Sequence, residues 1–253
     1  MNKSHPFRKK WGQNFLVDQN LLEKIVRTIN PEQDESILEI GPGEGALTEK
    51  LLPNVGEMLA VEIDPLLIKH LNNHMILSRC HFVQGDILKQ DIEDLPISNP
   101  VRVMGNIPYN ITSPIIFWLV EQQDFWNDAF LMVQKELAER LVATCGSKTY
   151  SRITVMVGVY LDVKLCFTIP PEVFIPRPKI HSAFIRFTKK KTPLVSDEKY
   201  ERFYKIVKAA FSQRRKMLRN TLKGFTFPEG TEERIDFTRR PETLTLEEFA
   251  SLV

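Results

Sequence analysis

The stretch EIGPGEG, residues 39–45, decides the fold class of this 253-residue chain. The apolar run Ile37–Leu38 stands directly before it and leucines recur at helical spacing after it, which predicts a strand, a glycine turn and a helix. Glycines in such a turn let the backbone approach a ligand at the carboxyl end of the strand. The third glycine comes one residue too early for the G-x-G-x-x-G of dinucleotide-binding loops, and Pro42 separates the first two. We therefore expect a nucleoside-like ligand without a pyrophosphate.

The same strand–turn–helix pattern continues through most of the chain. A helix precedes it, from Val17 to Asn30, with Asp18 as the expected N-cap. Strands that alternate with helices indicate a parallel sheet covered on both faces. The last two strands are joined by a proline-rich connection too short for a helical crossover, so we expect them to pair antiparallel. The predicted strands are residues 37–40, 58–61, 81–83, 101–104, 130–133, 163–169 and 182–187.

Charge divides the chain near residue 189. Residues 189–223 hold twelve Lys or Arg against three acids, whereas residues 224–253 hold three against seven. Apolar residues continue at helical spacing, which predicts a small all-helical domain with one basic face over residues 189–253, after a sheet domain over residues 1–188. Such a face is typical of proteins that bind nucleic-acid phosphates, and basic residues near the N-terminus should add to it. The predicted RNA-binding residues are Arg8, Lys9, Lys10, Lys208, Arg214, Arg215, Lys216 and Arg219.

Composition limits the class of protein. Hydrophobic residues make up 43% of the chain, enough for a full core, and no run approaches the roughly 18 apolar residues of a membrane span. The basic N-terminus is not followed by the apolar segment of a secretory signal. Three cysteines without paired spacing indicate a reducing compartment, with neither a disulfide framework nor a zinc site. We expect a cytoplasmic monomer that does not bind a membrane. We also expect no metal site, because His70 and His74 lack a third metal ligand.

Two acids follow the next strands at positions suited to a nucleoside. Glu62 lies 21 residues after Gly41 at the end of the second sheet strand, where a carboxylate accepts hydrogen bonds from both ribose hydroxyls. Asp86 ends the third strand and can accept from the exocyclic amine of a purine. With the glycine turn, this set predicts a nucleoside ligand without phosphates, S-adenosylmethionine, on a Rossmann-like seven-stranded methyltransferase sheet. The plainer alternative is a helix N-terminus with ordinary surface acids.

The stretch GNIPYN, residues 105–110, ends the fourth strand beside the expected methyl group. The N6 amine of adenine is a poor nucleophile because its lone pair is delocalised into the ring. The side-chain oxygen of Asn106 and the backbone carbonyl of Ile107 can accept from that amine and localise the lone pair, while Pro108 stiffens the turn. Tyr109 offers a ring on which a base can stack. Methyl transfer to adenine is the expected chemistry, with positioning as its main catalytic contribution.

A family resemblance rests on motifs spread over nearly the whole chain: Gly12–Leu16, the glycine turn, Asn106–Tyr109, Phe174–Lys179, Ala210–Lys216 and Arg240–Glu242. In combination they resemble the ribosomal RNA adenine-N6 dimethyltransferases, in particular the bacterial small-subunit (KsgA/RsmA) type. The resemblance implies that Asn14 and Leu16 close over the cofactor and that Phe174 stacks on the target adenine opposite Tyr109. Ile107 stands where leucine is usual, which should be harmless because the backbone carbonyl makes the contact. The implied cofactor-binding residues are Asn14, Leu16, Gly41, Gly43, Glu62, Ile63, Asp86, Ile87 and Asn106.

The resemblance also implies a substrate: two adjacent adenines in a hairpin loop near the 3′ end of small-subunit (16S) rRNA, in the assembling 30S particle. Three alternatives stay open. A resistance-type methyltransferase of large-subunit RNA shares the catalytic motifs but is not expected to carry AAFSQRRKMLRN, residues 209–220. A DNA adenine methyltransferase more often has two prolines after the Asn or Asp and a separate target-recognition domain. A ribosome-assembly factor that hardly turns over would not need an intact pocket.

Overall fold

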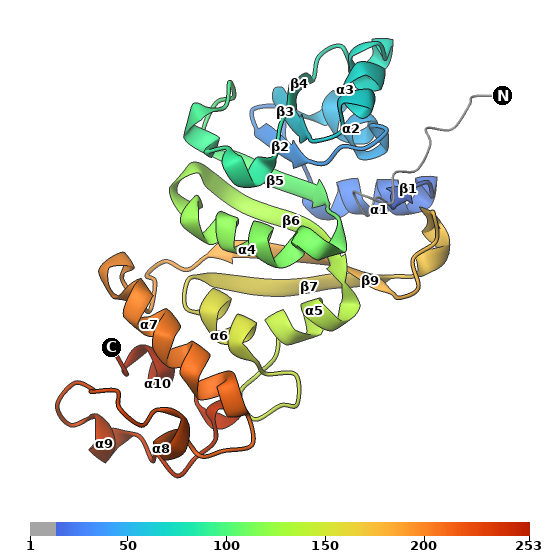
Figure 1. Cartoon of the computed structure of the whole chain (residues 1–253). Coiled ribbons are helices and arrows are strands. Elements are labelled where there is room, and N and C mark those ends of the chain that lie inside the picture. Colours follow the sequence, from blue (N-terminus) through green and yellow to red (C-terminus); the bar gives the residue numbers. More distant parts are fainter. Residues whose placement is uncertain (1–13) are drawn as a thin grey trace. The chain divides into compact units, whose positions relative to one another are not determined.

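A computed structural model describes residues 14–253. Its main element is a seven-stranded sheet with the strand order β4-β3-β2-β5-β6-β9-β7 (Figure 1). All seven predicted strands are present, so the predicted α/β fold class is confirmed. The strands are β2 (Ser36–Ile40), β3 (Glu57–Glu62), β4 (His81–Gln84), β5 (Val101–Asn106), β6 (Trp126–Gln134), β7 (Leu161–Ile169) and β9 (Ser182–Lys189).

Parallel pairing brings the carboxyl ends of four strands to one edge of the sheet. β2 pairs with β3 through Ile40 opposite Val61, and with β5 through Ile40 opposite Gly105. β4 continues the edge, with Gln84 opposite Glu62. β2 and β3 are buried at nearly every position, as expected for strands of a parallel sheet covered on both faces. The chain segments that leave these four ends therefore lie beside one another.

β6 begins four residues before the predicted strand. The prediction was too short because a buried acid interrupts the apolar pattern of the sequence. Asp128 is only 4% exposed and accepts hydrogen bonds from Arg102 at 2.7 and 3.0 Å and from Arg186 at 3.0 Å. The two guanidinium groups satisfy the carboxylate, so a charged residue is tolerated inside the strand. Arg102 also donates to the carbonyl of Ile29 at 2.8 Å, which ties the end of the first helix to the sheet.

The helices follow the expected start and stop signals. Asp18 caps the first helix as predicted, accepting from the backbone N–H of Leu21 at 2.8 Å, and Asn30 ends that helix with a φ of 50°. Asp64 caps α3 ahead of Pro65 in the same way. The helices are α1 (Gln19–Ile29), α2 (Ala46–Leu51), α3 (Pro65–Asn72), α4 (Thr112–Glu121), α5 (Lys135–Leu141), α6 (Arg152–Gly158), α7 (Asp197–Ala210), α8 (Leu218–Thr221), α9 (Thr231–Arg234) and α10 (Leu246–Ala250).

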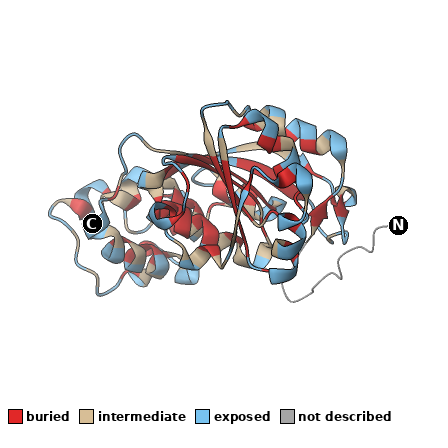
Figure 2. Ribbon diagram, turned by 90° about the horizontal axis from the view of Figure 1, so that it is seen from above, coloured by how far each residue is buried: buried red, intermediate tan, exposed pale blue. Residues whose placement is uncertain are grey.

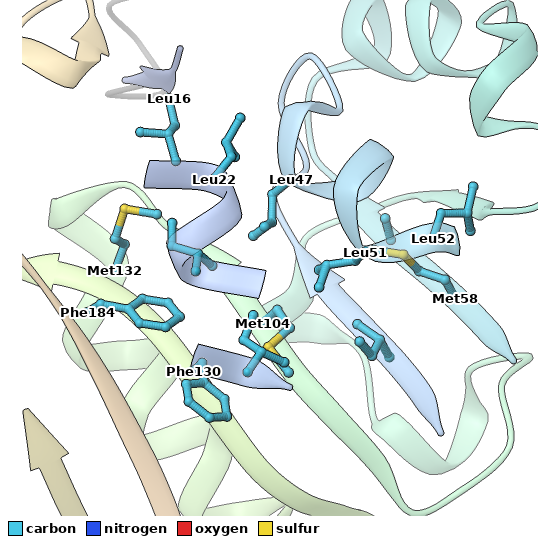
Figure 3. Close-up of a cluster of buried hydrophobic side chains, with 14 of the residues drawn as sticks. Leu16, Leu22, Leu47, Leu51, Leu52, Met58, Met104, Phe130, Met132 and Phe184 are labelled. Carbon is cyan, nitrogen blue, oxygen red and sulfur yellow. The ribbon is translucent and has the colours of Figure 1, made fainter. Parts of the chain in front are cut away.

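The core beside the sheet is formed by α1, α2 and apolar side chains of the strands (Figure 3). Leu22 of α1 is fully buried with Met104 of β5, and the rings of Phe130 and Phe184 stack with centroids 5.5 Å apart. In Figure 2 the buried positions follow the strands, while exposed positions lie on the outer sides of the helices. The sheet edge that carries the strand ends is thus supported by a rigid, tightly packed base.

A second, two-stranded sheet pairs β1 (Phe15–Leu16) antiparallel with β8 (Phe174–Ile175). Leu16 stands opposite Phe174, and the N–H of Val17 donates to the carbonyl of Val173 at 3.0 Å. These strands were not predicted, because two residues are too few to show a periodic pattern. The pairing fixes the segment that carries Asn14 and Leu16 beside the main sheet.

The described chain forms two compact units: residues 14–135 with 165–187, and residues 136–164 with 188–253. Residues 190–253 contain helices and no strand, which agrees with the predicted helical C-terminal part. Compactness assigns α5 and α6 to the second unit as well. The boundary at residue 188 stays a prediction about where the catalytic domain ends. No helix within residues 14–253 has the length and apolar character needed to span a membrane.

The basic stretch of the second unit is not one continuous helix, contrary to its apolar spacing. α7 ends at Ala210, a short 3-10 turn covers Phe211–Gln213, and α8 starts only at Leu218. The N–H of Leu218 donates to the carbonyl of Arg239 at 2.9 Å, so the start of α8 is bonded to the segment around Arg239 and not to the preceding helical turn. Arg214, Arg215 and Lys216 therefore lie on an exposed turn between two helices.

Candidate active site

A cavity of about 340 Å³ opens at the edge where the four strand ends meet. Segments after β2, β3, β4 and β5 form its walls, and β1 contributes the N-terminal side. Every residue of the predicted cofactor-binding set lines it, together with Ile107, Pro108 and Tyr109. The structure thus brings together residues that are up to 95 positions apart in the chain, from Asn14 to Tyr109. The sequence places the glycine turn, Glu62, Asp86 and Asn106 at four separate strand ends, whereas Asn14 and Leu16 follow only from the family resemblance.

The glycine turn after β2 has the backbone geometry that only glycine adopts easily. Gly41 and Gly43 have φ angles of 66° and 61°. A Cβ atom on Gly43 would lie 2.9 Å from the ring of Phe15, so the turn also needs the absence of a side chain. The close approach of Phe15 closes one side of the cavity. Phe15 was not among the predicted site residues.

Glu62 is held rigidly at the end of β3. It is 3% exposed, and its two carboxylate oxygens accept from the N–H groups of Asp64 at 2.9 Å and Gly43 at 3.3 Å. Burial raises the pKa of this carboxyl, while the two backbone bonds act in the opposite direction. Each oxygen keeps a further lone pair, so Glu62 can still accept from a ligand.

Glu39, the first residue of the quoted stretch, is a site residue that sequence reasoning missed. It is 2% exposed, lines the cavity, and accepts from the hydroxyl of Thr48 at 2.6 Å. The pKa of Glu39 is raised to about 7. Burial is the main cause and raises the pKa, the hydrogen bond from Thr48 lowers it, and the negative charge of Glu62 raises it. A charged residue inside the apolar run of β2 was the available signal, because a buried acid in a strand needs a partner or a function.

Asp86 follows β4 and caps the short turn after it. One of its oxygens accepts from the N–H of Leu88 at 3.2 Å, which fixes the side chain and leaves the second oxygen available to accept from a ligand. Ile63 and Ile87 stand beside the two acids in the cavity wall. Ile63 is 37% exposed, an unusual position for a large apolar side chain next to a buried strand end, and Ile87 is 4% exposed. These apolar surfaces can cover a flat aromatic ring.

Asn106 is positioned by the N-terminal segment. Its side-chain nitrogen donates to the backbone carbonyl of Asn14 at 2.9 Å, so the amide group is held in one orientation and its oxygen is left to accept. Ile107 is 2% exposed and anchors the turn in the core. The carbonyl of Pro108 accepts from the N–H of Ile111 at 3.1 Å, which closes the turn into a short 3-10 helix.

The ring of Tyr109 is fixed by a residue from a distant strand. Its hydroxyl lies 2.7 Å from the hydroxyl of Ser182, the first residue of β9, which is only 1% exposed. Burial raises the pKa of Tyr109, and the bond to Ser182 acts in the opposite direction. Sequence reasoning missed Ser182 because 73 residues separate it from Tyr109.

We expect Tyr109→Phe to keep most of the activity, because the variant keeps the ring. Tyr109→Ala should lose stacking worth roughly 1–3 kcal/mol, or about tenfold to hundredfold in activity. Ser182→Ala should cost less than tenfold, in line with one ordinary hydrogen bond of about 1 kcal/mol. Single-turnover methylation measures these effects. The double variant Tyr109→Phe with Ser182→Ala should lose less than the sum of both, because Phe alone leaves the buried Ser182 hydroxyl unpaired. Equal inactivity of Tyr109→Phe and Tyr109→Ala would rule out stacking as the role of the ring.

Some predicted site residues are not brought to the cavity. Phe174 is 2% exposed and packs in the core cluster on β8, so its stacking on a base stays a prediction that requires its ring to become accessible. Arg8, Lys9 and Lys10 lie outside the described residues. The remaining predicted RNA-binding residues are exposed and belong to the second compact unit: Lys208, Arg214, Arg215, Lys216 and Arg219.

The charge of the cavity limits what it can hold. Four acids line it, and none of its described lining residues is Lys, Arg or His. A pyrophosphate would meet acidic and no basic side chains in this described lining, whereas a ligand with cationic groups is favoured. Within residues 14–253 no group of three His, Cys, Asp or Glu is arranged to hold a metal ion. The acids are Glu39, Glu44, Glu62 and Asp86.

These features define a Rossmann-like α/β methyltransferase fold, in which a turn of the type Asn-Ile-Pro-Tyr follows β5 at the mouth of a nucleoside-sized cavity. The model of one protein family, described as ribosomal RNA adenine dimethylase, matches residues 4–252. The chain therefore belongs to the ribosomal RNA adenine dimethylase family.

Similar proteins extend over nearly the whole chain. Two relatives are named Ribosomal RNA small subunit methyltransferase A. The one from Dechloromonas aromatica (strain RCB) is 39% identical over 99% of this chain and 98% of its own length. The one from Saccharophagus degradans is 42% identical over 99% of this chain and 94% of its own length.

Two solved structures have the same fold over 94% of this chain. A dimethyladenosine transferase from Plasmodium falciparum superposes with a TM-score of 0.81 at 26% identity and is covered over 95% of its length. The 23S rRNA methyltransferase ErmE superposes with a TM-score of 0.74 at 27% identity and is covered over 98% of its length. The small-subunit relatives are thus more similar in sequence than this large-subunit enzyme.

Proposed function

We propose that this chain transfers methyl groups from S-adenosylmethionine to N6 of two adjacent adenines in a hairpin loop near the 3′ end of small-subunit (16S) rRNA, during assembly of the 30S particle. The product is N6,N6-dimethyladenine at both positions. The observation that carries the proposal is the orientation of the Asn106 side chain. Its nitrogen donates to the backbone carbonyl of Asn14, so its oxygen is left to accept at the mouth of the acidic cavity. The names of the relatives support the choice of small-subunit RNA.

The cavity residues fit S-adenosylmethionine, which supplies a methyl group on a positively charged sulfur. Glu62 would accept from the ribose hydroxyls and Asp86 from the adenine amine. Ile63 and Ile87 would cover the adenine ring, which accounts for the exposure of Ile63. The acidic lining of the cavity would favour the positive charge of the ligand. Asn14 and Leu16 would close it, since β1 lies along its N-terminal side.

The turn after β5 would activate and hold the target base. The side-chain oxygen of Asn106 and the carbonyl of Ile107 would accept from the two hydrogens of the adenine amine, which favours a lone pair localised on nitrogen. Tyr109, fixed by Ser182, would stack on the flipped base. A general base is not required, because the amine becomes acidic once it is methylated and its proton can leave to water. Catalysis would rest on orientation and proximity.

The proposal is tested by incubating the protein with labelled S-adenosylmethionine and, separately, 30S particles, 50S particles and DNA. We expect label only in 30S particles, and nucleoside mass spectrometry should find two methyl groups on each of two neighbouring adenines. Label in 50S particles would instead favour a large-subunit enzyme, and label in DNA a DNA methyltransferase. Tight binding to 30S without label would favour an assembly factor that hardly turns over.

Recognition of the particle is assigned to the helical part of the chain, whose exposed basic residues suit RNA phosphates. We expect the triple variant Arg214→Ala, Arg215→Ala, Lys216→Ala to bind 30S particles more weakly and with a salt dependence reduced by up to about 0.7–0.9 per lost phosphate contact. The affinity for S-adenosylmethionine should not change. Titrations with 30S at several salt concentrations measure the slope. An unchanged affinity and slope would remove this turn from the RNA-binding surface.

We further propose that the protein acts in the cytoplasm as a monomer.

A further inference from the structure

The loop of residues 144–151, here called the 144–151 loop, connects α5 to α6 within the second compact unit. It is attached to the rest of that unit at its middle and its end. The N–H of Gly146 donates to the carbonyl of Glu242 at 2.6 Å. Tyr150 is 1% exposed, with its ring centroid 6.3 Å from that of Phe211. A surface loop with such anchors has little freedom left.

The third attachment comes from the basic turn between α7 and α8. The guanidinium of Arg214 donates to the carbonyl of Lys148 at 2.6 Å and to the carbonyl of Ser147 at 3.3 Å. Arg214 therefore bridges the turn and the 144–151 loop. Its neighbours Arg215 and Lys216 are also exposed, but neither makes a side-chain hydrogen bond or ion pair with another residue in the part of the chain that the structure describes.

Two cations on or next to the loop are in the same situation as Arg215 and Lys216. Lys148 lies in the loop and Arg152 is the first residue of α6. Both are exposed, and within residues 14–253 neither side chain has a hydrogen-bond or ion-pair partner. Because Arg214 holds the backbone of Lys148 to the turn, the four unpaired cations lie on or next to two segments that are joined by hydrogen bonds. A rigid set of unpaired cations matches the phosphates of an RNA backbone.

We propose that the 144–151 loop and the start of α6 form a second part of the RNA-docking surface, in which Lys148 and Arg152 contact phosphates and Arg214 is a positioning residue that orders the loop. This inference rests on the proposed function and names the part of the chain that meets the RNA. It assigns a recognition role to residues that precede the predicted domain boundary. It also gives Arg214 a different role from Arg215 and Lys216, which contact phosphates directly.

The contact residues are tested with Lys148→Ala and Arg152→Ala in the full-length protein, with Lys69→Ala as a control that removes one positive charge from α3, in the other unit. We expect each of the two variants to bind 30S particles about two- to tenfold more weakly. Each should also reduce the salt slope by about 0.7–0.9. Lys69→Ala should leave both unchanged. Unchanged thermal unfolding shows that the second unit is folded in the variants, and unchanged affinity for S-adenosylmethionine shows the same for the first unit.

The positioning role is tested by hydrogen exchange at residues 146–150 and by a double-mutant cycle. Arg214→Ala should speed exchange of the loop amides, and Lys148→Ala should have a smaller effect on 30S binding in that background than in the wild type. Arg214→Lys keeps the charge but lacks the planar guanidinium whose Nη2 donates to both carbonyls, so it should restore neither the slow exchange nor the coupling. Full binding of 30S particles by Arg214→Lys, with loop amides that exchange as fast as in Arg214→Ala, would show that Arg214 is a phosphate ligand.

The outcomes separate this inference from the proposed function. If wild-type protein methylates 30S particles and the double variant Lys148→Ala, Arg152→Ala binds them with unchanged affinity and salt slope, the 144–151 loop is not part of the docking surface. If the wild-type protein neither binds nor methylates 30S particles, the proposed function itself is wrong.

Discussion

Asn106→Ala should lower the rate of methyl transfer by about two to three orders of magnitude, the loss seen when one preorganised hydrogen-bond partner of a transition state is removed. The variant loses the oxygen that is expected to accept from the adenine amine. It also loses the bond from the side-chain nitrogen to Asn14, which is 2.9 Å long and holds that oxygen in place. Affinity for 30S particles should change far less, because we assign particle binding to the basic residues of the second unit. Single-turnover rates with saturating 30S measure the chemical step.

The control for this prediction is Asn106→Asp. Aspartate keeps an acceptor oxygen but cannot donate to the carbonyl of Asn14, and it adds a fourth buried or half-buried carboxylate beside Glu39, Glu62 and Asp86. We expect an activity between those of wild type and Asn106→Ala. A variant Asn106→Ala that turns over at the wild-type rate, with only its affinity for RNA reduced, would show that Asn106 binds substrate without taking part in activation.

The second large effect concerns the cofactor. Glu62→Ala should weaken binding of S-adenosylmethionine by about tenfold to a hundredfold, because hydrogen bonds to a charged group contribute roughly 1.5–3 kcal/mol. Isothermal titration calorimetry measures this affinity directly. Glu62 also accepts from the backbone N–H groups of Gly43 and Asp64, so thermal unfolding must be compared in parallel. Glu62→Gln has the same shape but only one acceptor oxygen, so it keeps one of the two backbone bonds and should bind the ligand with intermediate affinity.

The matched control is Glu44→Ala, an exposed acid on the same glycine turn. It should change the affinity only slightly, since it contributes charge without a fixed position. NAD should not bind, because its pyrophosphate would face four acids and no basic side chain in the described lining of the cavity. If Glu62→Ala binds S-adenosylmethionine as tightly as the wild type, Glu62 does not hold the ribose.

Much of the fold could be predicted because its signals are local. The apolar strands, the caps Asp18 and Asp64 and the glycine turn each act within a few residues of chain. The errors arose where a distant partner changes the local preference. β6 continues through Asp128 because Arg102 and Arg186 neutralise it. The helical spacing continues beyond Ala210, but α7 ends there and the N–H of Leu218 donates to the carbonyl of Arg239 instead. Neither partner can be found from local periodicity.

The candidate site divides in the same way. Gly41, Glu62, Asp86 and Asn106 were predictable because each lies at or just after the end of a strand, and parallel strands end at a common edge. Ser182 and the bond from Arg214 to the 144–151 loop were not, because both depend on contacts between segments far apart in the chain. Glu39 was visible as an acid in an apolar strand, but its raised pKa depends on burial that only the packed structure reveals.

The register of β2, β3 and β5 has a consequence for how this chain can change in evolution. Ile40 stands opposite both Val61 and Gly105, so the glycine turn, Glu62 and Asn106 leave the sheet at one level. One residue inserted into β5 would shift Asn106 by about 3.3 Å along the strand and turn its side chain to the opposite face. Insertions in the segments that enter the strands from the opposite edge would leave all three residues in place. Length variation among functional relatives should therefore accumulate on the side of the sheet that faces away from the cavity, while the distances from each strand to its site residue stay constant.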